Sequence, residues 1–465
     1  MKTPHFLPLA AILLMAVPPV LAAEATPPPK RPNVLFIVID DLRDWVGFLG
    51  RHPQAKTPNL DRLAARGVAF TRAYAASPSC NPSRAAVLSG LRPFTTGVYE
   101  NDTDWRPVVP EAMTLPSAFR RAGYHVAGGG KVYHTAYPRR SEWDDYFADA
   151  DRNPRPAQIR GPGDRIKFGA LDVEDGEMRD AKVVDYAIRQ LAQKRDQPLF
   201  LAVGIQKPHL PWFVPRKYFD LHPLDRIELP PYLKGDLEDV PAEGRRLATH
   251  LGDHEAILKA GLWKEAVQAY LAAISFADAM VGRLLDGLDR SPDRDNTIIC
   301  LWSDHGWSLG EKDHWRKFAL WEEQTRAPMI WVVPGLTKPG TVATKPVDLM
   351  SVYPTLCDLA GLPVPEHVEG RSLRPLLADA AAHWEQPAIS TYLFNNHSIR
   401  TEGWRYTRYH DGGEELYNER EDPNEWRNLA ADPASQPVKA ELSRWLPPKN
   451  HPDRVPGGQH RDVDN

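Results

Sequence analysis

Cys80 lies in a segment whose residue types favour chemistry on an anion. The segment reads Ser79-Cys80-Asn81-Pro82-Ser83-Arg84, and helix-forming residues follow at 85–88. Because proline suits the first turn of a helix, we expect Cys80 to stand just before a helix N-terminus. Free N–H groups and the helix dipole favour negative charge there, and Arg84 adds a cation. Cys80 is therefore a candidate nucleophile, and an ordinary thiol of low pKa is the simpler alternative.

Three further polar clusters follow apolar runs that are typical of buried strands. They are Asp40-Asp41 after residues 33–39, Lys131 to His134 after residues 124–129, and Asp304-His305 after residues 297–302. In open α/β sheets, ligands bind outside the carboxyl ends of the strands, so these clusters are candidates for one shared site. Taken singly, the first could cap a helix, the second could be surface charge, and the third could be a turn.

The elements that must position these residues alternate along the chain. The predicted buried strands are 33–39, 124–129, 198–205, 297–302 and 328–333, and the predicted helices are 57–64, 115–121, 263–284 and 349–359. Thr57 is expected to cap the first of these helices, with Pro58 in its first position. Alternation of this kind predicts an α/β fold with a large, mostly parallel sheet and helices on both faces.

The pattern changes after about residue 365. Short strand candidates follow at 388–392, 398–401, 404–409 and 415–417, and a helix is expected near 438–445. Gly-containing turns between short strands indicate a smaller antiparallel sheet. We therefore expect a catalytic domain over residues 31–365 and a C-terminal subdomain over residues 366–465.

The N-terminus reads as an export signal. Lys2 is followed by an apolar run at 9–17, which is too short to span a membrane, and small residues precede position 23. We predict a signal peptide over residues 1–23, and an uncleaved anchor is the alternative. Export places the protein in the periplasm or medium, or in the lysosome of a eukaryotic host, with no stable membrane insertion after cleavage.

Composition limits the classes of function. The chain has 42% hydrophobic residues, 25% charged residues and a net charge of −4. It therefore lacks the basic footprint of a nucleic-acid partner and carries no polybasic membrane patch. Only three cysteines occur, which argues against a disulfide-stabilised protein, and Cys300 and Cys357 lie in apolar patterns that predict burial.

Several motifs together resemble one enzyme family. Cys80-Asn81-Pro82-Ser83-Arg84 matches the C-x-P-x-R motif of type I, formylglycine-dependent sulfatases, and Gly130-Lys131-Val132-Tyr133-His134 resembles their second signature. That signature has Ser or Thr where Val126 stands, which is a local departure. Further matches are Thr57 to Ala64, Lys207-Pro208-His209, Ser303-Asp304-His305-Gly306 and Glu415-Leu416-Tyr417 with Asp422-Pro423. The resemblance covers nearly the whole mature chain.

Within that family, the chain is most similar to the iduronate-2-sulfatases. The segments that carry this similarity are Thr95-Thr96-Gly97-Val98-Tyr99 with Trp105-Arg106, Phe200-Leu201-Ala202-Val203-Gly204, and Ser303 to Glu311. Many arylsulfatases have Asn after the Asp of the last segment, where this chain has His305. The resemblance implies an alkaline-phosphatase-like fold and a hydrolase of sulfate esters.

The resemblance also implies the site and its cofactors. A formylglycine-generating or maturase enzyme would oxidise Cys80 to formylglycine. The implied metal ligands are Asp40, Asp41, Asp304, His305 and the modified Cys80, and the implied catalytic residues are Cys80, Arg84, Lys131, His134, His209 and Lys317. Oxygen-rich ligands favour Ca²⁺, with Mg²⁺ or Mn²⁺ as the alternatives. The formylglycine hydrate would attack sulfur and form a covalent sulfo-enzyme, with His209 donating a proton to the leaving oxygen and His134 assisting sulfate release.

The substrate expected from these features is a sulfated carbohydrate that contains uronic acid. Trp307 follows the metal-site turn and is expected to form a pocket wall, and Tyr99 and Trp105 lie in a segment similar to one near the iduronate enzyme's cleft. Arg139 and Arg140 stand where that enzyme has an acidic loop, and their guanidinium groups could bind a carboxylate or a second sulfate. Solvated surface charge is the simpler interpretation of both arginines.

Two other functions stay open from the sequence. The first is a phosphate or phosphonate monoester hydrolase of the same superfamily, some of which share C-x-P-x-R. The second is a non-catalytic polysaccharide-binding protein, which would follow if Cys80 stays unmodified. The complete set of ionisable groups argues against the second.

Overall fold

The computed structural model describes residues 1, 2, 4, 31–134, 139–148, 153–163 and 165–454. The predicted signal peptide, residues 1–23, falls outside the described residues except for positions 1, 2 and 4. Residues from 31 onward form one compact unit. Among the residues described, none of the helices combines the length and the apolar character that crossing a lipid bilayer requires.

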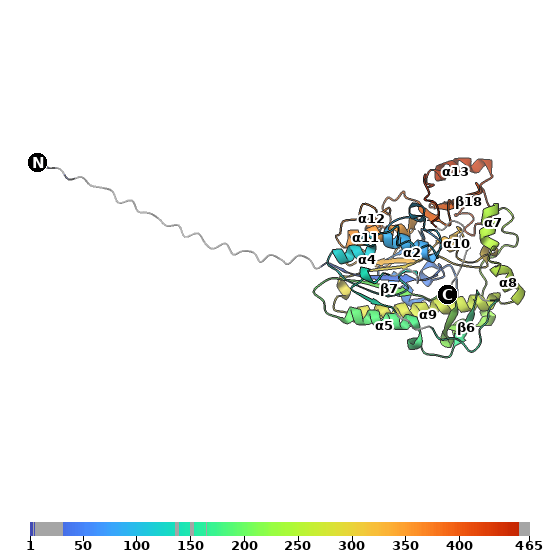
Figure 1. Cartoon of the computed structure of the whole chain (residues 1–465), viewed down its shortest axis with the longest axis horizontal. Helices are drawn as coiled ribbons and strands as arrows, with labels where there is room; N and C mark the ends of the chain where they lie inside the picture. Colours follow the sequence, from blue (N-terminus) through green and yellow to red (C-terminus); the bar gives the residue numbers. More distant parts are fainter. Residues whose placement is uncertain (3, 5–30, 135–138, 149–152, 164, 455–465) are drawn as a thin grey trace. The chain divides into compact units, whose positions relative to one another are not determined.

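A large sheet runs through the centre of this unit (Figure 1). Its strand order is β13-β2-β12-β9-β1-β7-β4-β5. The strands are β1 Asn33–Ile39, β2 Val68–Phe70, β4 His125–Gly130, β5 Asp145–Phe147, β7 Leu199–Ile205, β9 Thr297–Ser303, β12 Met329–Val332 and β13 Thr341–Ala343. Only β12 runs antiparallel to its neighbours among these described strands, so the predicted mostly parallel sheet is confirmed.

The central strand β1 shows why helices cover both faces. Leu35, Ile37 and Ile39 belong to one hydrophobic core, and the alternate residues, such as Phe36, belong to another. Successive side chains of a strand point to opposite faces, so an all-apolar strand needs cover on both sides. In Figure 1, α5 and α9 lie along one face, and α2, α4 and α11 lie over the other.

The helices vary widely in length, and α9 is the longest described. The α-helices are α1 Pro58–Ala64, α2 Cys80–Ser89, α3 Pro93–Thr96, α4 Leu115–Arg121, α5 Arg179–Ala192, α6 Arg216–Asp220, α7 Ala242–Thr249, α8 Asp253–Ala260, α9 Trp263–Asp289, α10 Glu322–Thr325, α11 Val352–Leu359, α12 Arg374–Ala378 and α13 Gln436–Ser443. Short 3₁₀ turns are η1 Gly47–Leu49, η2 Glu111–Met113, η3 Arg140–Glu142, η4 Asp175–Glu177, η5 Leu224–Arg226, η6 Arg294–Asn296, η7 Glu311–Asp313, η8 Leu349–Ser351 and η9 Pro433–Ser435.

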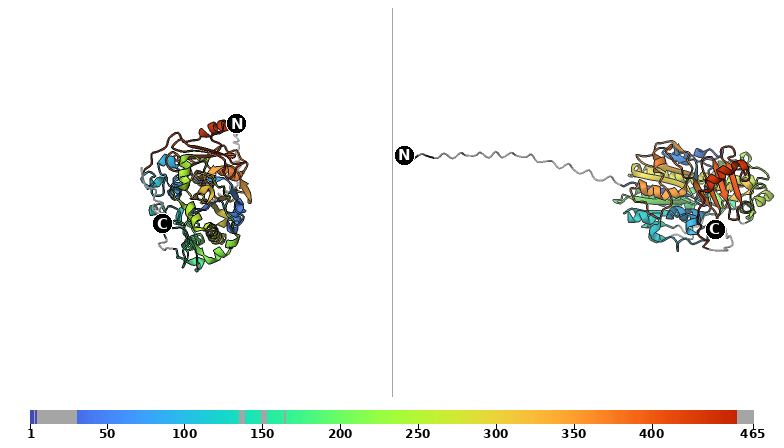
Figure 2. Two further views of the ribbon diagram at one scale, coloured as in Figure 1. Left: turned by 90° about the vertical axis from the view of Figure 1, so that its right-hand side faces the viewer. Right: turned by 90° about the horizontal axis from the view of Figure 1, so that it is seen from above.

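A second, four-stranded antiparallel sheet follows near the C-terminus (Figure 2). Its strands are β15 Ala388–Thr391, β16 His397–Arg400, β17 Trp404–Arg408 and β18 Glu414–Asn418. Ile399, Tyr406 and Leu416 of this sheet pack with Leu442 of α13 in a small core. Three two-stranded ribbons complete the described strands: β3 Ala73–Tyr74 with β14 Val347–Asp348, β6 Phe168–Leu171 with β8 Trp212–Pro215, and β10 Ser308–Leu309 with β11 Trp315–Arg316.

The predicted α/β class and the smaller antiparallel sheet are confirmed, with local corrections. Thr57 does stand at the N-cap of α1, but its hydroxyl accepts from Gly47 N at 2.7 Å instead of capping the helix. The helix predicted over 349–359 is a 3₁₀ turn, η8, that continues into α11. Cys300 and Cys357 are fully buried, as their apolar patterns predict.

Candidate active site

The predicted polar clusters meet at the carboxyl ends of neighbouring strands. Asp40 follows β1, Lys131 follows β4 and Asp304 follows β9, while His209 lies in the segment after β7. Cys80 is the first residue of α2, and Ser79 is the N-cap. Since β4, β7, β1 and β9 are adjacent and parallel, their carboxyl ends bring these groups to one edge of the sheet.

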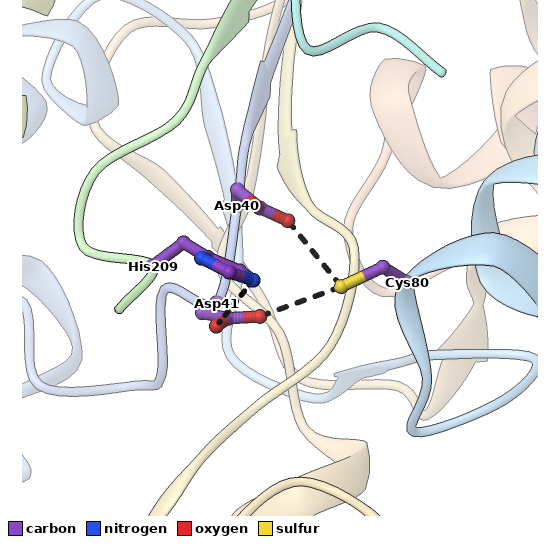
Figure 3. A group of neighbouring side chains, drawn as sticks. All are labelled: Asp40, Asp41, Cys80 and His209. Atoms are coloured by element: carbon purple, nitrogen blue, oxygen red, sulfur yellow. Dashed lines mark hydrogen bonds and ion pairs between the residues drawn. The ribbon is translucent and has the colours of Figure 1, made fainter. Parts of the chain in front are cut away.

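The thiol of Cys80 points toward the carboxylates of Asp40 and Asp41 (Figure 3). Its Sγ is 3.6 Å from Asp40 Oδ1, 3.6 Å from Asp41 Oδ1 and 3.4 Å from His305 Nε2. Cys80 has no exposed surface, and this burial raises the pKa of the thiol well above its usual value. Desolvation and the carboxylates of Asp40 and Asp41 outweigh the effect of Lys317 and Lys131 on this pKa.

The backbone conformation of Asp41 and the hydrogen bonds of Asp304 fix the positions of their carboxylates beside the thiol. Asp41 has φ 58°, a left-handed conformation that Asp tolerates better than most residues. Its N–H donates to Asp304 Oδ1 at 3.0 Å, and Ser83 Oγ donates to the carbonyl oxygen of Asp304 at 2.6 Å. These hydrogen bonds connect the residues that follow β1 and β9 with each other and with α2. They therefore fix the relative positions of the three elements.

Three cations lie among the carboxylates. Arg84 donates to Asp40 at 2.8 Å and to Asp304 at 2.9 Å, and Lys131 forms an ion pair with Asp40. Burial would raise the pKa of Asp40, but the charges of Lys131 and Arg84 hold it well below its usual range. Lys317 Nζ lies 2.9 Å from Cys80 Sγ and 3.0 Å from Asp41 Oδ1.

The donor set fits a divalent cation. Asp41, Cys80, Asp304 and His305 each offer one ligand atom, and these atoms lie within 4.8 Å of one another. Asp41 Oδ2 is buried and accepts no hydrogen bond from the described residues, which suits a carboxylate that awaits a cation. His305 Nδ1 is 2.9 Å from the carbonyl oxygen of Gly306, and donation there leaves the lone pair of Nε2 facing the carboxylates.

His209 belongs to a second possible metal-binding group, with Asp40, Asp41 and Cys80. Its Nε2 is 3.8 Å from Asp41 Oδ2, as Figure 3 shows. Its Nδ1 is 2.6 Å from the carbonyl oxygen of Leu210, so Nδ1 donates there. His209 carries a proton on Nε2 as well only when the ring is charged, and a proton-donor role therefore needs the imidazolium.

His134 lies at the less buried side of the group. Burial lowers the pKa of its imidazole to about 3, and the charges of Lys131 and Lys317 add to this shift. The ring is therefore neutral near pH 7 and can accept a proton. His134 and Lys131 also line a cavity of about 160 Å³, together with Tyr146, Arg179 and other residues.

The three aromatic residues expected in the substrate pocket lie instead in the interior. The exposed fractions of Tyr99, Trp105 and Trp307 are 0%, 1% and 0%. The ring of Trp307 stacks on Tyr270, with centroids 6.2 Å apart, and Trp105 lies under a guanidinium group. Neighbouring side chains cover these rings, and Lys317 Nζ lies 5.7 Å from the ring of Trp307, so the roles expected of the three residues in the substrate pocket stay predictions.

The two arginines expected at the rim lie outside the buried group. Arg139 is half-buried and Arg140, at the start of η3, is exposed. Among the interactions of the described residues, none joins either guanidinium to the buried carboxylates, so a role in binding the distal part of a substrate stays a prediction.

Two anchors of the site were missed from the sequence. Asp180, in α5, accepts hydrogen bonds from the backbone N–H groups of Gln206 and Lys207, both at 2.9 Å, and so anchors the segment that carries His209. Glu142 pairs with Arg106 and accepts from Tyr133 Oη, next to His134. No motif marks Asp180 or Glu142, because their partners are far away in the sequence.

Comparisons with known proteins decide the family. Residues 32–362 match the family described as Sulfatase, and residues 310–451 match the one described as N-sulphoglucosamine sulphohydrolase, C-terminal. This chain belongs to the sulfatase family. It is therefore a sulfuric ester hydrolase, and the predicted membership is confirmed.

Relatives and solved structures agree with this family. A protein named Sulfatase from Formosa agariphila is 38% identical over 457 residues, which cover 92% of this chain and 89% of the relative. Iduronate 2-sulfatase from Homo sapiens is 31% identical over 383 residues, covering 72% and 70%. A phosphonate monoester hydrolase from Silicibacter pomeroyi has a TM-score of 0.75 at 23% identity, covering 89% and 94%, and this likeness shows the alkaline-phosphatase-like fold alone.

Proposed function

We propose that this sulfatase hydrolyses sulfate esters of a sulfated carbohydrate through a formylglycine made from Cys80. The observation that carries the proposal is the position of Cys80, whose buried Sγ lies within 3.6 Å of two carboxylates, one imidazole and the Lys317 ammonium, with Arg84 and Lys131 paired to Asp40 beside it. A sulfate ester is an anion that repels nucleophiles, and this arrangement supplies the positive charge that offsets the repulsion.

Asp40, Asp41, Asp304 and His305 are proposed to hold a divalent cation together with the modified residue 80. Three carboxylates and one imidazole favour Ca²⁺, with Mg²⁺ or Mn²⁺ as the alternatives. When bound, the cation would neutralise sulfate charge and favour the ionised form of the nucleophile. Formylglycine would supply, as its hydrate, a hydroxyl at the position that the thiol holds in this structure.

The other residues of the group bind charge and move protons. Arg84 and Lys131 fix the carboxylate of Asp40 and face the sulfate oxygens. We propose that His209, as the imidazolium, donates the Nε2 proton to the leaving oxygen, beside Lys317. We propose that His134, a neutral ring that lines the same cavity as Lys131, accepts the proton that must leave residue 80 before sulfate is released.

The substrate is proposed to carry a uronic acid near the sulfated position. The similarity to iduronate 2-sulfatase supports a sugar acid, and Arg139 and Arg140 offer guanidinium groups for its carboxylate. The test compares kcat/KM on sulfated uronate oligosaccharides before and after carboxyl reduction, in the wild type and in Arg139→Ala/Arg140→Ala. A contact of this kind contributes about 1.5–3 kcal/mol. Equal rates on both substrates in the wild type would favour a neutral sulfated sugar.

Desulfation of a panel of sulfated oligosaccharides, followed by mass spectrometry, tests the function itself. Phosphonate monoesters belong in the same panel, because a hydrolase of those esters is the second candidate and shares the fold. Binding of the oligosaccharides without turnover would favour the non-catalytic alternative. We also propose export after removal of residues 1–23 and action of a formylglycine-generating or maturase enzyme on Cys80.

A further inference from the structure

The loop that carries Lys317 has an unusual backbone. We call residues 310–318 the lysine loop. Lys312, Asp313, Arg316 and Phe318 have φ values of 51°, 49°, 74° and 83°, and these are four of the eight non-glycine residues with positive φ in the described chain. L-residues seldom adopt this region, and such strain persists only where the surroundings impose it. The lysine loop is therefore held in place by its contacts.

Most of these contacts come from the segment that contains α7 and α8. Arg316 pairs with Asp253 at 2.8 Å, and both side chains are buried. Trp315 Nε1 donates to His254 Nδ1 at 3.1 Å. Lys312 Nζ donates to Asp236 at 2.9 Å. Asp253, His254 and Asp236 therefore bind side chains of the lysine loop, and none of the three belongs to the catalytic group.

Two contacts act on the backbone of Lys317 and its neighbour. His314 Nε2 lies 2.7 Å from the carbonyl oxygen of Lys317, and Phe318 N donates to the carbonyl oxygen of Pro78 at 3.0 Å. Pro78 precedes Cys80 by two residues, so the second contact ties the lysine loop to the nucleophile's own segment. Together the two contacts fix the peptide group that joins Lys317 to Phe318.

His314 connects that main chain to α7. Its Nδ1 lies 2.9 Å from the carbonyl oxygen of Ala248, at the end of α7, and the residue is only 1% exposed. Carbonyl oxygens only accept, so a neutral imidazole donates to one of its two partners and an imidazolium donates to both. The side chain touches none of the groups proposed to meet the substrate except through Lys317.

We propose that His314 is a positioning residue that fixes Lys317 against the nucleophile, an inference that rests on the proposed function. Lys317 is fully buried, and its Nζ lies 2.9 Å from Cys80 Sγ and 3.0 Å from Asp41 Oδ1. Because hydrogen bonds weaken quickly beyond about 3.2 Å, a small shift of the Lys317 main chain removes both contacts. A displacement of about 1 Å at a catalytic group can cost about 100-fold in rate.

The proposed place of Lys317 beside the leaving oxygen gives a readout specific to positioning. A sugar alcohol is a poor leaving group and needs help, whereas 4-nitrophenolate leaves with little help. Loss of Lys317 placement should therefore slow a sugar sulfate far more than 4-nitrophenyl sulfate. Damage to the fold alone would slow both substrates equally.

Two substitutions at one position make the test. His314→Gln can place its amide N–H near the position of Nε2, within reach of the Lys317 carbonyl, whereas His314→Asn can place its amide only near the position of Nδ1. We expect kcat on a sulfated uronate disaccharide to fall about 100-fold in His314→Asn and to stay within about threefold of wild type in His314→Gln. With 4-nitrophenyl sulfate, both variants should stay within about threefold.

Equal losses on the two substrates, or equal losses in the two variants, would overturn the proposal. His222→Asn is the matched control, since His222 is also buried and its ring contacts Ser275 Oγ at 3.0 Å in another part of the fold. In a Lys317→Ala background, His314→Asn should cause no further loss on the disaccharide, and a further loss would also contradict the proposal. The extent of Cys80 modification is measured in every variant. An unreactive wild type would count against the proposed function instead.

Discussion

Two buried clusters of charged side chains differ in arrangement. The charged atoms of one converge on a common centre, and those of the other pair with one another. In the first, Asp41 and Cys80 belong to two overlapping groups of converging ligand atoms, one with Asp304 and His305 and one with Asp40 and His209. The second, which we call the C-terminal charge cluster, joins the small sheet to α10 and consists of Glu322, Arg400, Arg405, Glu419 and Glu425.

The charged groups of the C-terminal cluster pair with one another, although burial still raises the pKa of Glu419 and Glu425 above the usual value. Arg400 donates to Glu322 at 3.0 Å, Arg405 pairs with Glu425 at 2.5 Å, and Glu425 also accepts from the N–H of Glu322 at 2.8 Å. The charges of Arg400 and Arg405 outweigh burial and hold the pKa of Glu322 well below its usual value. Burial of charge alone is therefore no sign of function, and convergence of donors on one point is the more informative feature.

The largest expected effect separates the nucleophile from the interior cysteines. Cys80→Ala should reduce turnover of 4-nitrophenyl sulfate below detection, because the precursor of the nucleophile is removed. Cys300→Ala should keep kcat and lower the free energy of unfolding by about 1–2 kcal/mol, since it only leaves a small cavity. Peptide mass spectrometry of the wild type should find formylglycine at position 80. A wild type with full activity and an intact thiol would contradict the mechanism.

Removal of the cation tests the convergent donors. Chelation should abolish turnover and added Ca²⁺ should restore it, because the buried carboxylates would otherwise repel the substrate. Asp304→Ala should lower the metal content measured by elemental mass spectrometry. Asp278→Ala is the control, because Asp278 is equally buried but caps the N–H groups of Asn59 and Leu60 outside the site. Full turnover in metal-free protein would refute the assignment.

A substitution in the C-terminal charge cluster should change the free energy of unfolding and leave kcat nearly unchanged. Arg405→Met removes the ion pair of Glu425 and one of the pairs of Glu322, and the free energy of unfolding in urea should fall by about 3–5 kcal/mol. The kcat per folded molecule should stay within about twofold, since the change lies outside the catalytic group. Arg420→Met, at an exposed position, should change stability by less than about 0.5 kcal/mol. A selective loss of kcat in Arg405→Met would remove the distinction between the clusters.

The last comparison concerns two neutral histidines. Burial lowers the pKa of His134 to about 3 and that of His52 to about 4. Between these values and about 6.5 the unfolded chain binds more protons, so the free energy of unfolding falls as the pH drops through that window. His134→Gln and His52→Gln should each reduce this acid sensitivity in urea titrations. Only His134→Gln should slow turnover, and an equal slowing by His52→Gln would count against the role of His134.

Much of the fold followed from local patterns. Runs of β-branched and apolar residues predict β1, β7 and β9 closely, because a strand that is buried on both faces must be apolar throughout. Placing Asp40, Lys131 and Asp304 needed only the rule that ligands bind at the carboxyl ends of parallel strands. The short strand β2 was not predicted, since three residues give too little periodicity to detect.

The direction in which a side chain points after the end of a strand was harder to predict. Trp307 follows the turn at Asp304 and His305, but Tyr270 and Trp212, from distant segments, cover its ring. The sequence contains no local signal for such packing, because the partners are set by the tertiary fold. Asp180 was missed for the same reason, since the backbone groups it anchors lie in another segment of the chain.

The complete burial of Cys80 has a consequence for the time at which it is modified. Its partner Lys317 lies 237 residues further along the chain, so the enclosure cannot close until that residue has left the ribosome. At about 5–20 residues per second, synthesis of the intervening stretch takes roughly 10–50 s. A modifying enzyme would meet Cys80 as part of an extended peptide during that interval, and afterwards the thiol is sealed inside the folded protein. The order of synthesis would then limit the yield of active enzyme.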